Sequence, residues 1–113
     1  MHELSIAQSI VELSEQEARK NKATSIEELE LEIGVLAGVE WVALEFALES
    51  AIKGSLLENA RIIKQRVSGE GVCGDCENRF SMENLLSSCP ACGSNVVKIV
   101  KGKELRIKSI VVK

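Results

Sequence analysis

Four cysteines constrain this chain more than any other feature. They form two pairs, each with two intervening residues, and twelve residues separate the pairs; they are Cys73, Cys76, Cys89 and Cys92. Two residues between cysteines let one tight turn present both sulfurs to one ion, and four thiolates complete the tetrahedron that Zn²⁺ prefers. Gly74 and Gly93 suit such turns. The spacing therefore predicts a ribbon around Zn(II) with no open coordination position, which is typical of a structural site.

Two other chemistries of paired cysteines remain as alternatives. A thioredoxin-like redox pair needs one C-x-x-C motif at the start of a helix in a βαβ unit, and it would leave the second pair unexplained. Iron–sulfur ligation also uses four thiolates. Phe80 lies between the two pairs, and we expect it to form the small core of the ribbon rather than a platform for stacking bases.

Composition limits the fold and the location. The chain has 113 residues, of which 45% are hydrophobic and only 3% aromatic, so we expect an aliphatic core in one domain or two very small ones. No apolar stretch reaches the ~18 residues that a membrane span requires, and the N-terminus has no secretory-signal pattern. These features predict a cytoplasmic protein, in which clustered cysteines bind metal more often than they form disulfides.

Hydrophobic periodicity predicts two helices and three strands outside the cysteine segment. Helices are expected over 5–20, with a Ser5/Gln8 capping box, and over 39–53. Strands are expected over 28–34, where apolar residues alternate with glutamates, over 60–67 and over 104–112. The apolar faces are Ile6, Ile10 and Leu13 for the first helix, Val42, Phe46, Leu48 and Ile52 for the second, and Leu105, Ile107 and Val111 for the last strand.

The order of these elements predicts an α+β fold. A small domain of two helices and a roughly three-stranded sheet comprises 1–68 plus 103–113, and the zinc ribbon at 69–102 is inserted into it. Because the last strand follows the ribbon, we expect it to return to the first sheet.

Charge and motifs restrict the function. Residues 1–68 hold 7 basic and 12 acidic residues, a net of −5, and residues 69–113 hold 7 and 5, a net of +2. The cysteine segment itself is acidic, which argues against a nucleic-acid interface. The single histidine has no nearby nucleophile pattern and no phosphate-binding loop is present, so we do not expect an enzyme. A nucleic-acid-binding or general protein-interaction zinc ribbon stays the alternative.

The N-terminus offers a second group of metal ligands. His2 is the only histidine, and the α-amine of Met1, the amide nitrogen of His2 and its imidazole can form adjacent chelate rings. Such nitrogen sites suit Ni(II) or Cu(II). A histidine near a terminus is also commonly a solvated residue, and Glu3 commonly a helix N-terminal carboxylate, so composition alone does not decide between these readings.

Three sequence features together resemble the HypA/HybF family of nickel-insertion proteins for [NiFe]-hydrogenase maturation. They are the opening Met-His-Glu-Leu-Ser, the stretch Gly-Val-Glu-Trp-Val-Ala-Leu-Glu-Phe-Ala, and the four-cysteine module. The resemblance implies transient Ni(II) at His2 with Glu3 contributing, structural Zn(II) at the cysteines, and an acidic residue, here Glu40, near the nickel. It also implies delivery to the hydrogenase large subunit or its maturation complex with a HypB-type GTPase, and in some organisms service to urease.

Overall fold

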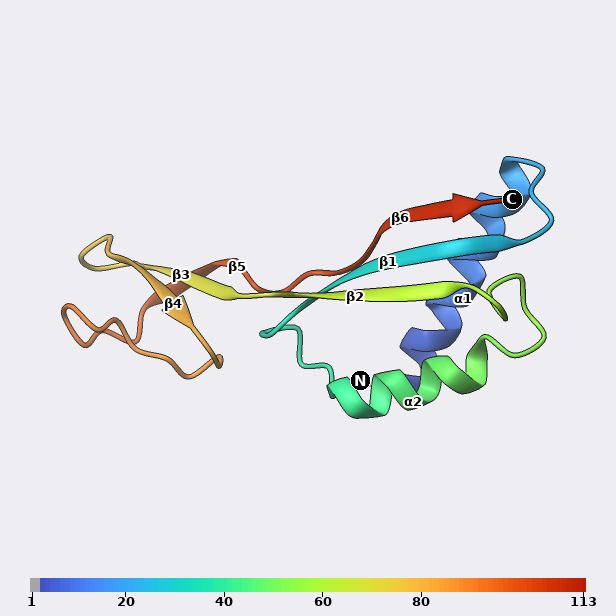
Figure 1. The fold of residues 1–113 in the computed structure, drawn as a ribbon. Helices are drawn as coiled ribbons and strands as arrows, with labels where there is room; N and C mark the ends of the chain where they lie inside the picture. Colours follow the sequence, from blue (N-terminus) through green and yellow to red (C-terminus); the bar gives the residue numbers. More distant parts are fainter. Residues whose placement is uncertain (1–2) are drawn as a thin grey trace. The chain divides into compact units, whose positions relative to one another are not determined.

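The fold combines two helices with two small sheets. The computed structural model describes residues 3–113, and Figure 1 shows the elements in place. They are α1 (Glu3–Lys20), β1 (Ile26–Gly34), α2 (Trp41–Ala51), β2 (Arg61–Val67), β3 (Gly69–Cys73), β4 (Arg79–Met82), β5 (Val97–Lys101) and β6 (Leu105–Val112). The strands of the cysteine segment come between β2 and β6 along the chain. The predicted fold class, α+β with an inserted four-cysteine segment, is confirmed.

The chain divides into two compact units. The first consists of the residues up to Leu31, Val39–Gln65 and Arg106–Lys113. The second consists of Glu32–Gly38 and Arg66–Leu105. Residues 32–38 thus belong to the second unit, whereas the boundaries drawn from the sequence place them in the first domain.

The side chains that α1 buries recur every three or four residues, as an amphipathic helix requires. They are Ala7, Ile10, Val11, Ser14 and Ala18. The Ser14 hydroxyl is fully buried and donates to the Ile10 carbonyl oxygen at 2.7 Å. The prediction for Leu13 is wrong, because it is 56% exposed; at 100° per residue it points nearly opposite to Val11. The helix also begins at Glu3, so Ser5 lies in the first turn and is not the N-cap.

The first sheet has the strand order β2-β1-β6. Along β1, Leu29, Leu31 and Ile33 are buried while the glutamates between them are partly exposed, which confirms the predicted alternation. β6 runs antiparallel to β1, as bonds from Lys113 to Ser25 and from Gly34 to Glu104 indicate. β1 and β2 run in the same direction (Figure 1), and the chain between them carries α2, the crossover that parallel neighbours need.

The predicted inward face of β6 is correct only over its first half. Leu105 and Ile107 are half-buried, but Val111 is 45% exposed, and Ile110 and Val112 are the partly buried residues near the end. Two consecutive exposed residues, 108 and 109, shift the alternation by one position. A shift of one residue moves every following side chain to the other face of a strand.

The predicted face of α2 is correct for Leu48 but wrong for Val42 and Phe46. Leu44, Ala47 and Leu48 are buried, whereas Val42 is 71% and Phe46 74% exposed. The helix is apolar on both sides, so its periodicity does not identify the side that faces the core. Among the described residues, neither helix is long and apolar enough to cross a membrane.

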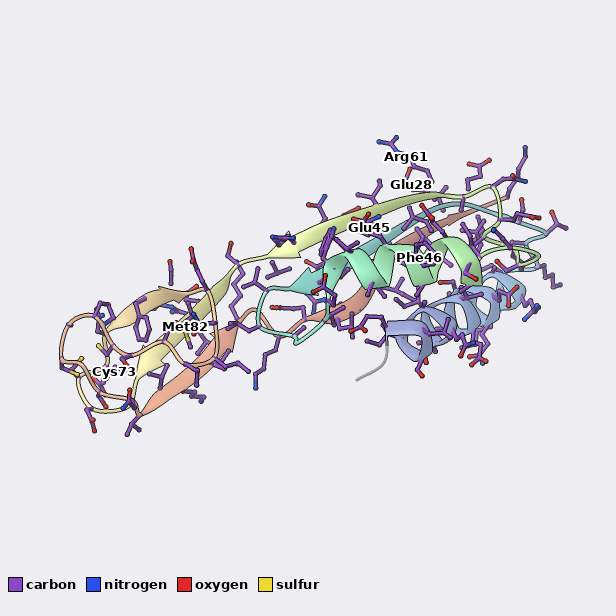
Figure 2. The ribbon with its side chains drawn as sticks, turned by 90° about the horizontal axis from the view of Figure 1, so that it is seen from below. Glu28, Glu45, Phe46, Arg61, Cys73 and Met82 are labelled. Atoms are coloured by element: carbon purple, nitrogen blue, oxygen red, sulfur yellow. The ribbon has the colours of Figure 1, made fainter. Side chains whose placement is uncertain are left out.

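The second unit contains the sheet β4-β3-β5. Both neighbours pair antiparallel with β3, and Gly71 lies opposite Phe80 on β4 and Ile99 on β5. Phe80 is half-buried. Met82, 2% exposed, points into the interior of this unit (Figure 2).

Three glycines from distant parts of the second unit pack tightly around Leu36. A Cβ atom on Gly34 would lie 1.9 Å from the Gly102 carbonyl oxygen, and one on Gly102 would lie 2.6 Å from the Gly69 Cα. Leu36 is 4% exposed, and its amide donates to the Gly102 carbonyl oxygen at 2.7 Å. This contact explains why residues 32–38 join the second unit.

Substitution of Gly102 by alanine should destabilise the second unit strongly. Gly102 has φ +112, which L-residues rarely adopt, and its added methyl group would overlap Gly69. Together, strain and overpacking predict a loss of about 2–4 kcal/mol. Gly38→Ala is the matched control, since Gly38 has φ +73 in the same unit but nothing within 4 Å. Urea unfolding of both variants measures the difference, and equal losses would contradict the packing argument.

Candidate metal sites

The two cysteine pairs adopt the same backbone turn. In each pair the amide of the first cysteine donates to the carbonyl five residues later, and its own carbonyl accepts from the amide four residues later. The bonds are Cys73 N to Asn78 O and Glu77 N to Cys73 O, and then Cys89 N to Ser94 O and Gly93 N to Cys89 O, all 2.8–3.0 Å. β3 ends at Cys73, so the first cysteine pair begins at the last residue of this strand (Figure 2).

The four sulfurs form one cluster. Cys73 Sγ lies 3.6 Å from Cys92 Sγ, and Cys76 Sγ lies 3.6 Å from Cys89 Sγ. All four lie within 4.8 Å of one another. A tetrahedral zinc site with Zn–S bonds of about 2.3 Å has sulfurs about 3.8 Å apart. The cluster therefore fits a single tetrahedral ion such as zinc.

Both sulfur–sulfur separations of 3.6 Å join one cysteine pair to the other. All four cysteines are free thiols, and the 3.6 Å separations exceed the 2.03–2.05 Å of a disulfide bond. The arrangement thus favours a shared metal ion over a redox pair within one motif.

Hydrogen bonds to sulfur make one thiol of each pair more acidic. The amide of Cys76 lowers the pKa of Cys73, and both this amide and that of Asp75 lie 3.4 Å from Cys73 Sγ. Burial raises the pKa of Cys89, but amides in its own turn and the Asn78 side-chain amide, 3.8 Å away, outweigh burial and lower the pKa to about 6. In each pair the first cysteine is therefore the more acidic thiol, and the thiolate is the form that coordinates metal.

The partner cysteines are exposed and less acidic. The amide of Asn78 acts to lower the pKa of Cys76, but the adjacent Cys89 sulfur and burial outweigh it and raise the pKa to about 12. The pKa of Cys92 is raised as well; the amide of Ser94 opposes this shift and the Cys73 sulfur favours it. A metal ion must therefore displace protons from these two thiols, so its affinity falls as pH falls.

The two turns differ at the fourth residue after the first cysteine of each pair. Glu77 has φ +63 and Gly93 has φ +76, so only the first turn places a side chain in the left-handed region. We expect Glu77→Gly to stabilise the second unit by up to about 1 kcal/mol, because it removes the steric cost of this conformation. Thermal unfolding and metal loss to a chelator measure the effect. Glu77→Gln, which removes only the charge, is the control and should change little; equal gains in both variants would assign the effect to charge.

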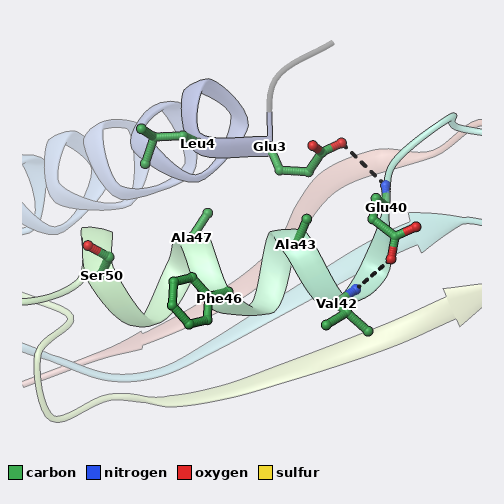
Figure 3. A pocket seen from close by; sticks show the side chains of 8 residues that line it. All are labelled: Glu3, Leu4, Glu40, Val42, Ala43, Phe46, Ala47 and Ser50. Atoms are coloured by element: carbon green, nitrogen blue, oxygen red, sulfur yellow. Dashed lines mark hydrogen bonds between the residues drawn. The ribbon is translucent and has the colours of Figure 1, made fainter.

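A second cluster of potential ligands lies at the N-terminal ends of the two helices. Glu40 is the N-cap of α2, and its carboxylate accepts from the Val42 amide at 3.3 Å. The Glu3 carboxylate, at the start of α1, accepts from the Glu40 amide, also at 3.3 Å (Figure 3). Glutamate is not among the residues that helices prefer as an N-cap, and both bonds are long. The Glu3 carboxylate thus lies against the backbone of Glu40, 37 positions away in the sequence.

The sequence as a whole matches one known family. Over residues 1–112 the chain matches the family described as hydrogenase/urease nickel incorporation, metallochaperone, HypA. The chain belongs to the HypA family. This confirms the resemblance noted in the sequence and makes the chain a member of a nickel metallochaperone family for hydrogenase maturation.

HypA proteins of several bacteria are similar to this chain over their full length. The hydrogenase maturation factor HypA of Parabacteroides distasonis is 66% identical over 113 residues, 100% of this chain and 98% of the relative. That of Prosthecochloris aestuarii is 41% identical over 110 residues, 97% of both. The solution structure of the Ni metallochaperone HypA from Helicobacter pylori superposes with a TM-score of 0.71 at 30% identity, covering 99% of this chain and 97% of that one.

The structure describes six of the residues that the sequence analysis singled out. The four cysteines meet in the second unit, and Glu3 meets Glu40 in the first. His2 lies outside the described residues. Sequence analysis missed Asn78, which donates to Cys89 Sγ; its place two residues after Cys76, where a side-chain amide can reach the opposite pair, is the only signal for it.

Proposed function

We propose that this HypA-family protein carries Ni(II) at its N-terminal end and delivers it in the cytoplasm for [NiFe]-hydrogenase maturation. The observation that supports this site best is the contact between Glu3 and Glu40. It puts the residue that follows His2 in the sequence against the start of α2, 3.3 Å from the Glu40 amide. An imidazole at position 2 would add a nitrogen donor to two nearby carboxylates.

The backbone at the start of α1 supports metal binding. An amide within the first four residues of a chain has no carbonyl four positions earlier, so α1, which includes Glu3, cannot use the His2 amide in a helical hydrogen bond. We infer that Ni(II) uses the Met1 amine, the His2 amide nitrogen and the imidazole, a nitrogen set that suits this ion. Glu3 then supplies negative charge or an oxygen ligand. Glu40 provides a second carboxylate at this end of the first unit.

We propose that Zn(II) occupies the cysteine cluster and has a structural role. Four thiolates at tetrahedral spacing fill the coordination sphere of zinc and leave no position for a substrate. The two clusters then have different roles. The zinc site is closed and stabilises the second unit, and the nickel site in the first unit exchanges its metal. We propose no catalytic step for either one.

Delivery requires partners, and we propose two. A HypB-type GTPase supplies nucleotide hydrolysis, and the hydrogenase large subunit or its maturation complex receives the metal. We propose no nucleic-acid partner, because residues 69–100 carry only Arg79 and Lys98 against four acidic residues and lack the basic stripe of nucleic-acid binders.

Nickel titration of the untagged protein by calorimetry tests the proposal. We expect one Ni(II) site per chain and release of protons on binding, since amine, amide and imidazole nitrogens must be free of protons to coordinate. Zinc content, measured in the same samples, should stay at one per chain throughout. A protein that binds no nickel, or that binds it only by displacing zinc from the cysteines, would contradict the proposal.

A further inference from the structure

An apolar surface remains uncovered on the first unit. Val42 is 71%, Phe46 74% and Leu4 52% exposed, although α2 buries Leu44 and Leu48 on its opposite side. Single exposed apolar side chains are normal on protein surfaces, but contiguous ones commonly mark interaction sites. Figure 2 shows Phe46 projecting from α2.

These side chains border one groove between the N-terminal halves of α1 and α2. On the two sides of the groove, Leu4 of α1 lies across from Ala47 of α2, and Glu3 lies across from Ala43 (Figure 3). The groove is lined by Glu3, Leu4, Glu40, Val42, Ala43, Phe46, Ala47 and Ser50, all from the first unit. The two small alanines leave room between the helices for an apolar side chain of another molecule.

Among the described residues, the charges that line the groove have one sign. They belong to Glu3 and Glu40, and both are acidic. Exposed Glu49 follows Phe46 by three residues and so lies on the same helical face. Lys53, the next cation on this face, lies beyond the end of α2. A partner that matches this surface carries apolar side chains flanked by lysine or arginine, because opposite charges favour encounter and correct orientation.

We propose that this groove, called the α1–α2 groove, is the docking site for a segment of the HypB-type GTPase. The segment carries apolar side chains that fill the space beside Leu4 and Phe46, and basic side chains that face Glu3, Glu40 and Glu49. This inference rests on the proposed function for the identity of the partner. The occupant covers the carboxylates at the proposed nickel end, so docking and metal exchange take place at one surface.

Binding of the purified HypB-type GTPase of the same genome tests the groove. Phe46→Ser should weaken the complex about tenfold or more, because exposed aromatic side chains at the centre of an interface contribute most to affinity. Leu13→Ser is the matched control: Leu13 is 56% exposed on α1 but does not line the groove, so affinity should not change. Glu49→Lys should slow association and flatten the dependence of affinity on salt.

Methyl NMR of the wild-type protein provides a second measurement that does not depend on the variants folding. Addition of the GTPase should shift the resonances of Leu4 and Val42 and leave those of Leu13 unchanged. Unchanged Leu4 and Val42 resonances, equal affinities for Phe46→Ser and wild type, or no complex at all would overturn the assignment. Sedimentation that shows Phe46-dependent self-association in place of GTPase binding would assign the groove to a second copy of the chain and would also overturn it.

Nickel calorimetry separates failure of the groove from failure of the proposed function. Phe46→Ser should bind Ni(II) as the wild type does, because Phe46 offers no ligand. If the wild type binds nickel but Phe46→Ser leaves the affinity for the GTPase unchanged, only the groove assignment fails. If the GTPase depends on Phe46 but the wild type binds no nickel, the carrier function fails and the docking surface stands.

Discussion

Cys89→Ser should remove zinc from the protein and unfold most of the second unit while the first unit stays folded. Zinc binding at such sites is coupled to folding and amounts to about 10–16 kcal/mol in small zinc domains. The second unit has only a small core besides the cluster. Its buried hydrophobic side chains are Ile33, Leu36, Cys73, Met82 and Cys89, and two of these are proposed ligands. The first unit keeps its own core, which includes the fully buried Leu29, Leu44 and Leu57.

Amide hydrogen exchange, read by NMR, measures this outcome. Amide protection should disappear from β3 and β5. It should remain in α1 and in the part of β1 that belongs to the first unit. Cys92→Ser is the comparison: its sulfur is exposed and its pKa is raised, whereas Cys89 is buried with a pKa of about 6. We therefore expect Cys89→Ser to cost more than Cys92→Ser. A Cys89→Ser protein with one zinc per chain and unchanged protection would show that these sulfurs do not hold the ion.

Acidification should mimic loss of a ligand. At pH 7 the Cys89 thiol, with a pKa of about 6, is a thiolate, whereas Cys76, with a pKa of about 12, keeps its proton until a metal displaces it. Protons compete with zinc for every thiolate, so zinc and the stability that it confers are retained at higher pH and lost as pH falls.

Local spacing made the cysteine site predictable. The C-x2-C turns depend only on a few consecutive residues, and the repeat of the same hydrogen bonds around Cys73 and Cys89 shows how little the site needs from the rest of the chain. The alternating glutamates of β1 are equally local, since one face of a strand is set by its own sequence.

The faces of α2 and the end of β6 could not be predicted in this way. Leu44 and Phe46 are both apolar, and only the position of α1 and the sheet determines which of them is buried. The exposure of Val111 follows from the shift in the inward–outward alternation of β6 at residues 108–109. No feature of the sequence predicts this shift. Glu40 meets Glu3 across 37 positions, a distance over which periodicity carries no information; the family resemblance was the only signal that drew attention to it.

His2→Ala should abolish most Ni(II) binding while leaving zinc in place. The imidazole supplies the only histidine nitrogen of the chain, and its loss opens the chelate ring that the backbone nitrogens form with it. In the wild type, binding should weaken steeply as pH falls through about 6.5, the ordinary pKa of histidine, because a protonated ring cannot coordinate. Deletion of Met1, or a tag that blocks its amine, should have a similar effect. Calorimetry at several pH values measures affinity and proton release together.

Two substitutions separate the contribution of the carboxylates from their role in capping. Glu3→Gln keeps a hydrogen-bond acceptor for the Glu40 amide but removes a charge near the cation, so we expect a smaller loss than for His2→Ala. Glu40→Ser keeps an N-cap for α2, since serine is preferred there, but removes a carboxylate. A drop in nickel affinity with unchanged thermal stability would identify Glu40 as part of the metal site, and unchanged affinity would make it a cap alone. If His2→Ala and the wild type bind nickel with equal affinity and equal proton release, the nickel site lies elsewhere in the chain, and the Glu3–Glu40 contact loses its proposed meaning.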